Sequence, residues 1–252
     1  MSYLLAIETS GKFGSVAIAP RDTDSLASIS SVDLPRVSGS AQSLAQCILQ
    51  VTKNCSLSLD ALGCIALVNG PGSFTGLRVG VATAKSLAYG LGVPVIGLDT
   101  LEVIHLQAEA TTSFSQQTHT IGHVHALLDA YRGQVFVKSK DRQGRYSETR
   151  VLDISEFLDC CRRKDSNPAS HAMVGPGAGR LRSFIDRELD AGDLRDWIAT
   201  VSWFGDQEFD PHAIYVASLG LKSWARGEQI EPFALLPNYF RGSAAEEKAK
   251  AV

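Results

Sequence analysis

The pattern of hydrophobic and polar positions divides the first hundred residues into short strands and two helices. Apolar runs bounded by turn residues are typical of strands, whereas apolar residues that recur every three or four positions are typical of helices. The predicted strands are 3–7, 15–19, 28–34, 64–68 and 94–98, and the predicted helices are 40–53, capped by Ser40, and 73–89, ended by Gly90. Hairpin strands thus precede units in which strands and helices alternate, which indicates a mixed sheet in an α/β fold.

The rest of the chain continues with a less regular version of the same pattern. The predicted strands are 122–129, 134–139 and 172–174, and the predicted helices are 100–110, 155–163, 180–189 and 211–226. Asp210 and Gly227 are the expected caps of the last helix. A second glycine-rich turn is expected at 175–179, and the small and charged residues 241–252 are expected to form a flexible tail.

The junction that follows strand 64–68 is the most informative stretch of the chain. Residues 69–78 read Asn-Gly-Pro-Gly-Ser-Phe-Thr-Gly-Leu-Arg. Gly70, Gly72 and Gly76 allow a sharp turn and a close approach of the backbone to another surface. Ser73 is a suitable N-cap for the helix that follows. Such a junction either cradles an anion on free helix N–H groups or lets another segment pack closely.

A nucleotide-binding interpretation of this junction finds only partial matches. The Walker pattern fails because Leu77 and Arg78, rather than Lys, follow Gly76. A dinucleotide fingerprint is closer, since Asp99 ends the next strand where a ribose-binding acid would lie. Hairpin strands before the unit argue against that fingerprint.

A packing interpretation rests on small residues in the helix 73–89. Gly76, Gly80, Ala84 and Ala88 recur every four positions and form one small-residue stripe, at which two backbones can approach closely. The remaining faces are largely apolar, so the helix is expected to be buried on more than one side. One side can cover the sheet, and the other needs the helix 40–53 or a second protein.

Composition and charge exclude several classes of protein. The 252 residues carry a formal net charge of -3 and no long basic block, which argues against a surface that grips nucleic acid by itself. The one small basic patch is at 162–164. Five cysteines without a C-x-x-C pair indicate neither a disulfide framework nor a zinc knuckle. No signal peptide and no apolar span of membrane length is recognisable, so a cytoplasmic protein is expected.

Several motifs together resemble one known family. They are Ile-Glu-Thr-Ser at 7–10, the glycine junction at 70–78, Val-Ala-Thr-Ala-Lys-Ser-Leu-Ala at 81–88, Leu-Asp-Ala-Tyr-Arg-Gly-Gln-Val at 128–135, and Pro-Asn-Tyr-Phe-Arg at 237–241. This set resembles the TsaB family, also called YeaZ, over nearly the whole chain. The chain departs from the family pattern at Glu8, where Asp is more usual, at 39–41, where a His is common, and within 131–134.

The resemblance implies an actin-like, sugar-kinase-like (ASKHA) fold of two related lobes. The lobes would be 1–102 with 210–240, and 103–209. It also implies a role in making threonylcarbamoyladenosine in tRNA, as the non-catalytic partner of a TsaD-type transferase that a TsaE-type ATPase joins. The family docks on its partner through the first two helices, and a homodimer through the same helices is possible. Contact with tRNA would then come through the complex.

The resemblance also assigns residues to a partner surface and to a structural loop. The loop is Gly70, Pro71, Gly72 and Ser73. The predicted partner interface comprises Leu44, Cys47, Ile48, Val51, Gly76, Gly80, Thr83, Ala84, Leu87 and Ala88.

Catalysis by this chain itself has little support in the sequence. Actin-like ATPases hold metal and water with one carboxylate on the first strand and another after a glycine turn. Glu8 can supply the first, but the turn 69–72 has no acid, and Asp129 is the remaining candidate. No catalytic residue, cofactor or metal is therefore expected. The alternative is a nucleotide-dependent actin-fold phosphotransferase or ATPase, with the turn at 175–179 near the base.

Histidine spacing offers only a weak metal signal. His105 is followed four residues later by Glu109 rather than by a second His. His123 and His125 form an H-x-H that can grip a metal from one face of a strand, although such a pair more often lines a partly exposed strand face.

Overall fold

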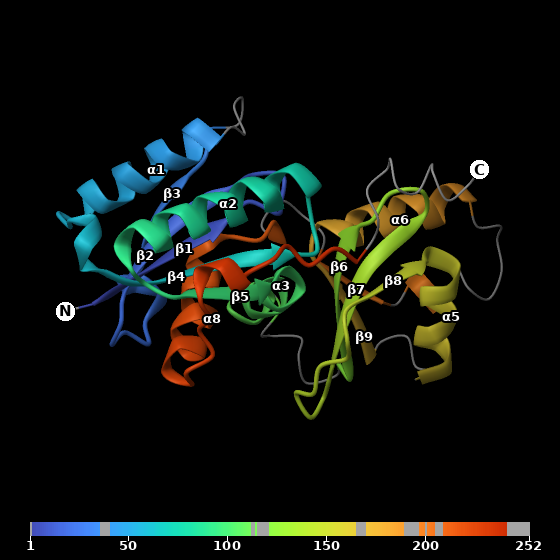
Figure 1. The fold of residues 1–252 in the computed structure, drawn as a ribbon. Helices are drawn as coiled ribbons and strands as arrows, with labels where there is room; N and C mark the ends of the chain where they lie inside the picture. Colours follow the sequence, from blue (N-terminus) through green and yellow to red (C-terminus); the bar gives the residue numbers. More distant parts are fainter. Residues whose placement is uncertain are drawn as a thin grey trace, which may run out of the picture. The chain divides into compact units, whose positions relative to one another are not determined.

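The structure is a computed structural model and describes residues 2–35, 41–111, 114, 121–164, 170–188, 197–199, 201–204 and 209–240 (Figure 1). The chain forms two compact units. The first consists of Met1–Val103 and Pro211–Val252, and the second consists of Ile104–Asp210.

The first unit is built on a five-stranded mixed sheet. Its strands are β1 (Tyr3–Glu8), β2 (Ser15–Pro20), β3 (Ser30–Asp33), β4 (Leu62–Gly70) and β5 (Val95–Asp99), in the order β3-β2-β1-β4-β5. β1 pairs antiparallel with β2 and parallel with β4, β2 pairs antiparallel with β3, and β4 pairs parallel with β5. The two hairpin pairings and the two parallel pairings give the mixed sheet that the sequence predicts.

Helices cover both faces of this sheet because its central strands are apolar on both sides. In β1, Leu5 and Ile7 face the core beneath α1 (Ala41–Asn54) and α2 (Phe74–Leu91). Leu4 and Ala6 face the opposite core, which α8 (Ala213–Ala225) closes. Figure 1 shows α1 and α2 on one side of the sheet and α8 on the other. α3 (Thr100–Glu109) follows β5 directly.

The second unit repeats the same strand topology. Its strands are β6 (His123–Asp129), β7 (Gln134–Asp141), β8 (Arg150–Asp153), β9 (His171–Val174) and β10 (Ser202–Phe204), in the order β10-β9-β6-β7-β8. β6 pairs antiparallel with β7 and parallel with β9, as β1 does with β2 and β4. α5 (Ile154–Lys164) and α6 (Pro176–Glu188) pack on Leu127, Val135 and Val137. This duplication gives the two related lobes with mixed sheets that the resemblance implies.

Several predicted boundaries are wrong. α2 ends at Leu91 because Gly92, rather than Gly90, adopts the left-handed conformation that stops the helix. His212, rather than Asp210, caps α8, since its side chain accepts from the N–H of Ile214. β8 and β10 were not predicted. The predicted cap Ser40, the end of the helix at Leu189 and the tail 241–252 lie outside the described residues.

The glycine-rich segment 175–179 is not the turn that the sequence predicts. α6 already begins at Pro176, whose fixed φ suits the first helical position. Gly175 alone has a positive φ there, and a Cβ on Gly177 would lie 2.6 Å from the backbone of Leu127. The glycines therefore allow a helix to start against β6.

None of the described helices is both long enough and apolar enough to cross a membrane.

Candidate functional site

The glycine junction between β4 and α2 packs against the protein's own backbone. A Cβ on Gly70, which has a φ of 137°, would collide with the carbonyl oxygen of Asn238. A Cβ on Gly72 would lie 2.7 Å from the carbonyl oxygen of Ser10. Gly76 faces the carbonyl oxygen of Thr9 in the same way. Each of these glycines is thus required because the backbone of another segment of the same chain lies against it. Of the two roles considered for the junction, anion binding and close packing, these contacts favour close packing.

Hydrogen bonds secure the junction on both sides. The N–H of Ser73 donates to the carbonyl oxygen of Ser10 over 2.8 Å, and the hydroxyl of Ser73 accepts from the N–H of Gly76 over 3.2 Å. On the other side, the N–H of Asn238 donates to the carbonyl oxygen of Asn69 over 2.6 Å. Ser73 is the N-cap that the sequence predicts, and the first turn of α2 is held by protein groups.

The carboxylates that a nucleotide-dependent reaction would use are engaged within the protein. Glu8 is fully buried, and its Oε1 accepts from the N–H and hydroxyl of Ser10, each over 2.6 Å, and from the N–H of Gly11 over 3.0 Å. Asp99 accepts from the N–H of Leu101 over 2.8 Å and so caps α3 instead of facing a ribose. Asp129 accepts from the N–H of Tyr131 over 2.7 Å. Glu8 and Asp99 thus shape the backbone at the ends of their strands.

The small-residue stripe of α2 faces the sheet, whereas the resemblance assigns it to a partner surface. A Cβ on Gly80 would collide with the hydroxyl of Thr9. Ala84 and Ala88 are fully buried in the core beneath α2. The stripe therefore lets α2 approach the end of β1 closely. On α1, the predicted interface residues Leu44, Cys47 and Val51 are core residues too.

A second surface of α1 and α2 is open and apolar. The two helices border a groove of about 570 Å³, to which a short 3₁₀ helix (Leu59–Ala61) also contributes. Three of the predicted interface residues, Ile48, Thr83 and Leu87, line it. The other lining residues are not among those predicted from the sequence, and they are Ala45, Leu49, Leu59, Ala82 and Ser86.

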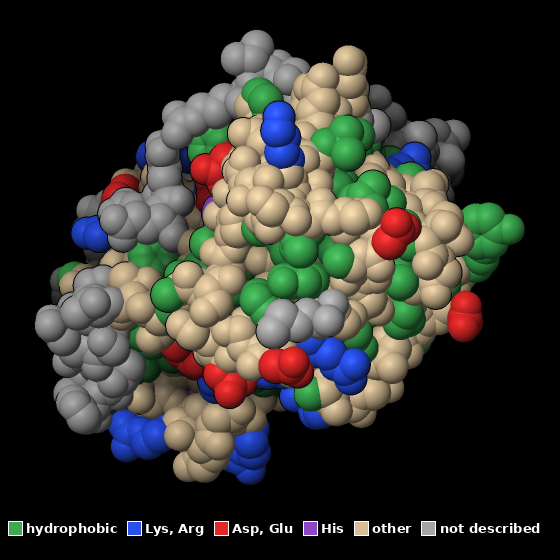
Figure 2. Space-filling view, turned by 90° about the vertical axis from the view of Figure 1, so that its left-hand side faces the viewer, with side chains coloured by type: hydrophobic (Ala, Val, Ile, Leu, Met, Phe, Trp, Pro, Cys, Tyr) green, Lys and Arg blue, Asp and Glu red, His purple; other side chains and the backbone are tan. Residues whose placement is uncertain are grey.

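The side chains that line this groove are apolar or small, and several of them are exposed to solvent. Leu49 is 59% exposed although it is one of the most hydrophobic residues of α1. On α2, Ala82, Thr83 and Ser86 present small side chains, which would let the backbone of another helix come close. None of the eight lining side chains is charged. Figure 2, which views the left-hand end of Figure 1, shows hydrophobic side chains interspersed with scattered charged ones on the surface that faces the viewer.

A further pair of exposed aromatic residues flanks α2. Tyr89 is 70% exposed and Phe233 66% exposed, and their rings meet edge to face with centroids 5.3 Å apart. Lys85 holds the segment of Phe233 against the helix by donating to the carbonyl oxygens of Phe233 and Leu235 over 3.3 and 3.0 Å. The apolar character of the α2 surface thus continues beyond the groove.

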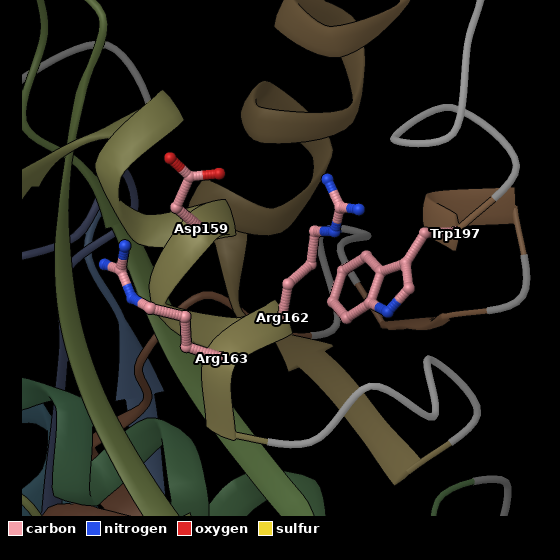
Figure 3. Close-up of a pocket in the computed structure, with 4 residues that line it drawn as sticks. All are labelled: Asp159, Arg162, Arg163 and Trp197. Atoms are coloured by element: carbon pink, nitrogen blue, oxygen red, sulfur yellow. The ribbon is translucent and has the colours of Figure 1, made fainter.

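The second unit carries a smaller, charged pocket. Asp159, Arg162, Arg163 and Trp197 line a space of about 450 Å³. Figure 3 shows Arg162 extending beside the Trp197 indole, whereas Arg163 leaves α5 on the other side and Asp159 points away from both. Arg163 donates to the sulfur of Cys160 over 3.3 Å. Two residues of the predicted basic patch, Arg162 and Arg163, thus line this pocket together with one carboxylate.

The histidines of α3 and β6 have different surroundings. His105 is buried, and its Nε2 lies 2.9 Å from the carbonyl oxygen of Lys138. Burial, reinforced by the charges of Lys140 and Lys138, lowers the pKa of His105 to about 4 even though this hydrogen bond opposes the shift. His125 is also buried, and it contacts His171 from β9 and Cys161 from α5. The predicted pair of His123 and His125 is therefore part of a larger cluster. No local sequence pattern predicts this cluster, because its other members lie on β9 and α5.

Comparison with known proteins gives consistent matches. The family model described as "TsaD: tRNA N6-adenosine threonylcarbamoyltransferase" matches residues 35–173. The chain is 26% identical to the tRNA threonylcarbamoyladenosine biosynthesis protein TsaB of Bacillus subtilis, over 77% of this chain and 76% of that protein. It is 27% identical to TsaB of Haemophilus influenzae, over 79% and 78%. The solved structure of YeaZ from Pseudomonas aeruginosa has a TM-score of 0.70 at 25% identity and covers 95% of this chain and all of its own.

Proposed function

The chain belongs to the TsaB (YeaZ) family, and from this membership we propose that it is a non-catalytic subunit of the machinery that makes threonylcarbamoyladenosine in tRNA. In this proposal it binds a TsaD-type transferase and supports its activity, and a TsaE-type ATPase joins the pair. The observation that carries the proposal is the apolar groove between α1 and α2.

The groove has the properties of a docking surface for a helical partner. It is lined by two long helices, and among the lining residues that the structure describes on α1, Leu49 is a large side chain that is 59% exposed. Leaving such a side chain in water is unfavourable, and burying it gains roughly 1.5–3 kcal/mol. An apolar groove between two helices is a surface into which another helix can lay its apolar face. The small side chains of Ala82, Thr83 and Ser86 make room for the partner backbone.

The partner is proposed to be a transferase of related fold. A structural relative would present its own first two helices, so that two similar helix pairs can pack together as a bundle. The same geometry permits a second copy of this chain to occupy the groove when the transferase is absent. A second copy of this chain and the transferase would thus compete for the same groove, and transferase binding would dissociate the homodimer.

The state of the carboxylates supports a non-catalytic role. Holding a metal–nucleotide complex requires carboxylate oxygens that face the phosphates. Glu8 is instead fully buried and bonded to the turn that follows β1. The junction 69–72 supplies no acid, and its glycines face the backbone of Ser10 and Asn238. These features disfavour the alternative of an actin-fold phosphotransferase.

The proposal is tested by reconstituting tRNA modification. Transferase, ATPase, tRNA and the threonylcarbamoyl donor are combined with and without this chain, and modified adenosine is measured by mass spectrometry of the digested tRNA. We expect modification only when the chain is present. Equal modification in its absence would contradict the proposal, and ATP hydrolysis by the chain alone would favour the phosphotransferase instead.

A further inference from the structure

Three buried side chains of the second unit bring their metal-ligating atoms together. Nε2 of His125 lies 3.0 Å from Nδ1 of His171, and Sγ of Cys161 lies 3.8 Å from the same Nε2. All three ligand atoms lie within 4.8 Å of one another. They come from three elements, β6, α5 and β9, and His125 lies 36 residues before Cys161 in the sequence. We propose that His125, Cys161 and His171 form a zinc-binding site.

The spacing of the atoms is close to what zinc requires. Zinc binds imidazole nitrogen at about 2.0–2.1 Å and thiolate sulfur at about 2.3 Å in a tetrahedral arrangement. These bond lengths place two nitrogens about 3.3 Å apart, and a nitrogen and a sulfur about 3.6 Å apart. The observed separations of 3.0 and 3.8 Å differ from these values by a few tenths of an ångström. The third separation, between Nδ1 of His171 and Sγ of Cys161, lies within 4.8 Å.

A hydrogen bond orients His125 toward the cluster. Its other nitrogen, Nδ1, lies 2.8 Å from the hydroxyl oxygen of Ser139, which is its direct partner on β7. With the ring proton on Nδ1 and donated to Ser139, Nε2 presents its lone pair to the metal. An outer hydrogen-bond partner of this kind is a regular feature of histidine ligands, because it fixes the tautomer and the ring orientation.

Aromatic rings enclose the cluster and keep it apart from bulk solvent. The ring of Phe157 meets His125 edge to face at 5.4 Å between centroids, and the Trp197 indole lies 5.3 Å from His171. His123 stacks on His171 at 5.2 Å and so belongs to the wall. In such surroundings a thiolate needs a cation to balance its charge.

The donor set selects the class of metal. One thiolate and two imidazoles suit zinc, whereas magnesium and calcium prefer oxygen ligands. Binding forms one Zn–S and two Zn–N bonds, the Cys161 thiol releases its proton to solvent, and both imidazoles bind as neutral rings. The fourth position is left to a water molecule or another added ligand. The bound ion would tie α5 to the two parallel strands β6 and β9.

Cobalt provides a direct optical test on the full-length chain. Tag-free protein is reduced, freed of metal with a chelator and titrated with Co²⁺, which takes zinc sites and absorbs strongly when a thiolate is bound. We expect a thiolate-to-cobalt band that saturates at one equivalent and disappears when Zn²⁺ is added. Cys161→Ser should lose the band. Cys160→Ser, a matched control at the neighbouring half-buried cysteine, should retain it.

A measurement on the wild-type protein keeps the test decisive if Cys161→Ser does not fold. X-ray absorption of the zinc-loaded wild type should show one sulfur and two imidazole rings around the ion. The proposal is overturned if folded wild-type protein takes up no Co²⁺ with thiolate character. It is equally overturned if the band persists in Cys161→Ser or if the zinc shell lacks sulfur. The cluster would then be a hydrogen-bonded imidazole pair beside a thiol. None of these results depends on the transferase.

Discussion

Gly76 of α2 lies directly against the carbonyl oxygen of Thr9, the residue that follows β1, so closely that a Cβ on Gly76 would overlap that oxygen. This contact fixes how deeply α2 settles on the sheet. It also explains why the most distinctive motif of the chain carries a glycine at this position, in a helix where glycine is otherwise unfavourable.

The substitution Gly76→Ala should therefore destabilise the first unit. The added methyl group must push α2 away from the end of β1, and overpacking of this kind costs about 1–3 kcal/mol or more. Urea denaturation should show a lower midpoint. Gly90→Ala is the matched control, because a Cβ there meets nothing within 4 Å, and it should stabilise α2 by up to about 1 kcal/mol. Equal effects of the two substitutions would refute the close contact.

Leu49→Glu should weaken partner binding without affecting the fold. Leu49 is 59% exposed at the groove, so a carboxylate there remains hydrated in the free protein but loses its water in a complex. We expect the transferase affinity, measured by isothermal titration, to fall at least about tenfold, which corresponds to about 1.4 kcal/mol. Leu236→Glu provides the control, since Leu236 is 67% exposed in the same unit and does not line the groove. A similar loss of affinity in both variants would remove the groove from the interface.

His105 should make the second unit sensitive to acid. Its pKa is lowered from 6.5 to about 4 in the folded protein, mainly by burial, so the unfolded chain binds the proton more readily. Stability is then fully present above about pH 6.5 and falls as the pH drops toward about 4. The full effect is on the order of 3 kcal/mol.

The contribution of His105 is isolated by comparison with His105→Gln. The amide of Gln can donate to the carbonyl oxygen of Lys138 but does not titrate. Between pH 6.5 and 4 the unfolding free energy of the wild type should therefore fall more steeply than that of the variant. Parallel pH profiles would show that His105 is not the responsible group.

Cys64 should resist alkylation as long as the protein is folded. It is fully buried in β4, and burial raises the pKa of its thiol to about 12. At mildly alkaline pH, iodoacetamide should modify the half-buried Cys55 and Cys160 and leave Cys64 unmodified until denaturant is added. Mass spectrometry of the digested protein reads each site separately. Modification of Cys64 at the rate of Cys160 under native conditions would contradict the burial of β4.

Local sequence signals were sufficient for most of the first unit. The Ser73 cap and the apolar periodicity after it give α2 its start, and alternating or continuous apolar runs give β1, β2, β4 and β5. The end of α2 was misplaced because Gly90 and Gly92 are equivalent in sequence, and only the backbone shows which one is left-handed. β10 was missed because three residues are too few to show a period.

Properties that depend on tertiary contacts are harder to predict from the sequence. The glycines at 175–179 predict a turn by propensity, yet Gly177 lies in α6 because it packs on the backbone of Leu127. The spacing of Gly76, Gly80, Ala84 and Ala88 correctly indicates a close approach but cannot say to which surface. Leu49 and Ala82 were missed for the same reason, since their exposure depends on how α1 and α2 pack together. Likewise, no local pattern in the sequence predicts that Cys161 and His171 contact His125.

The proposal of a partner subunit is tested most directly by size-exclusion chromatography with light scattering. This chain is mixed with the TsaD-type transferase of the same organism, and the mass of the eluted species is measured. We predict a complex of one copy of each protein for the wild type and for Leu236→Glu, but separate elution for Leu49→Glu. Separate elution of the wild type, with or without ATP and the ATPase, would contradict it.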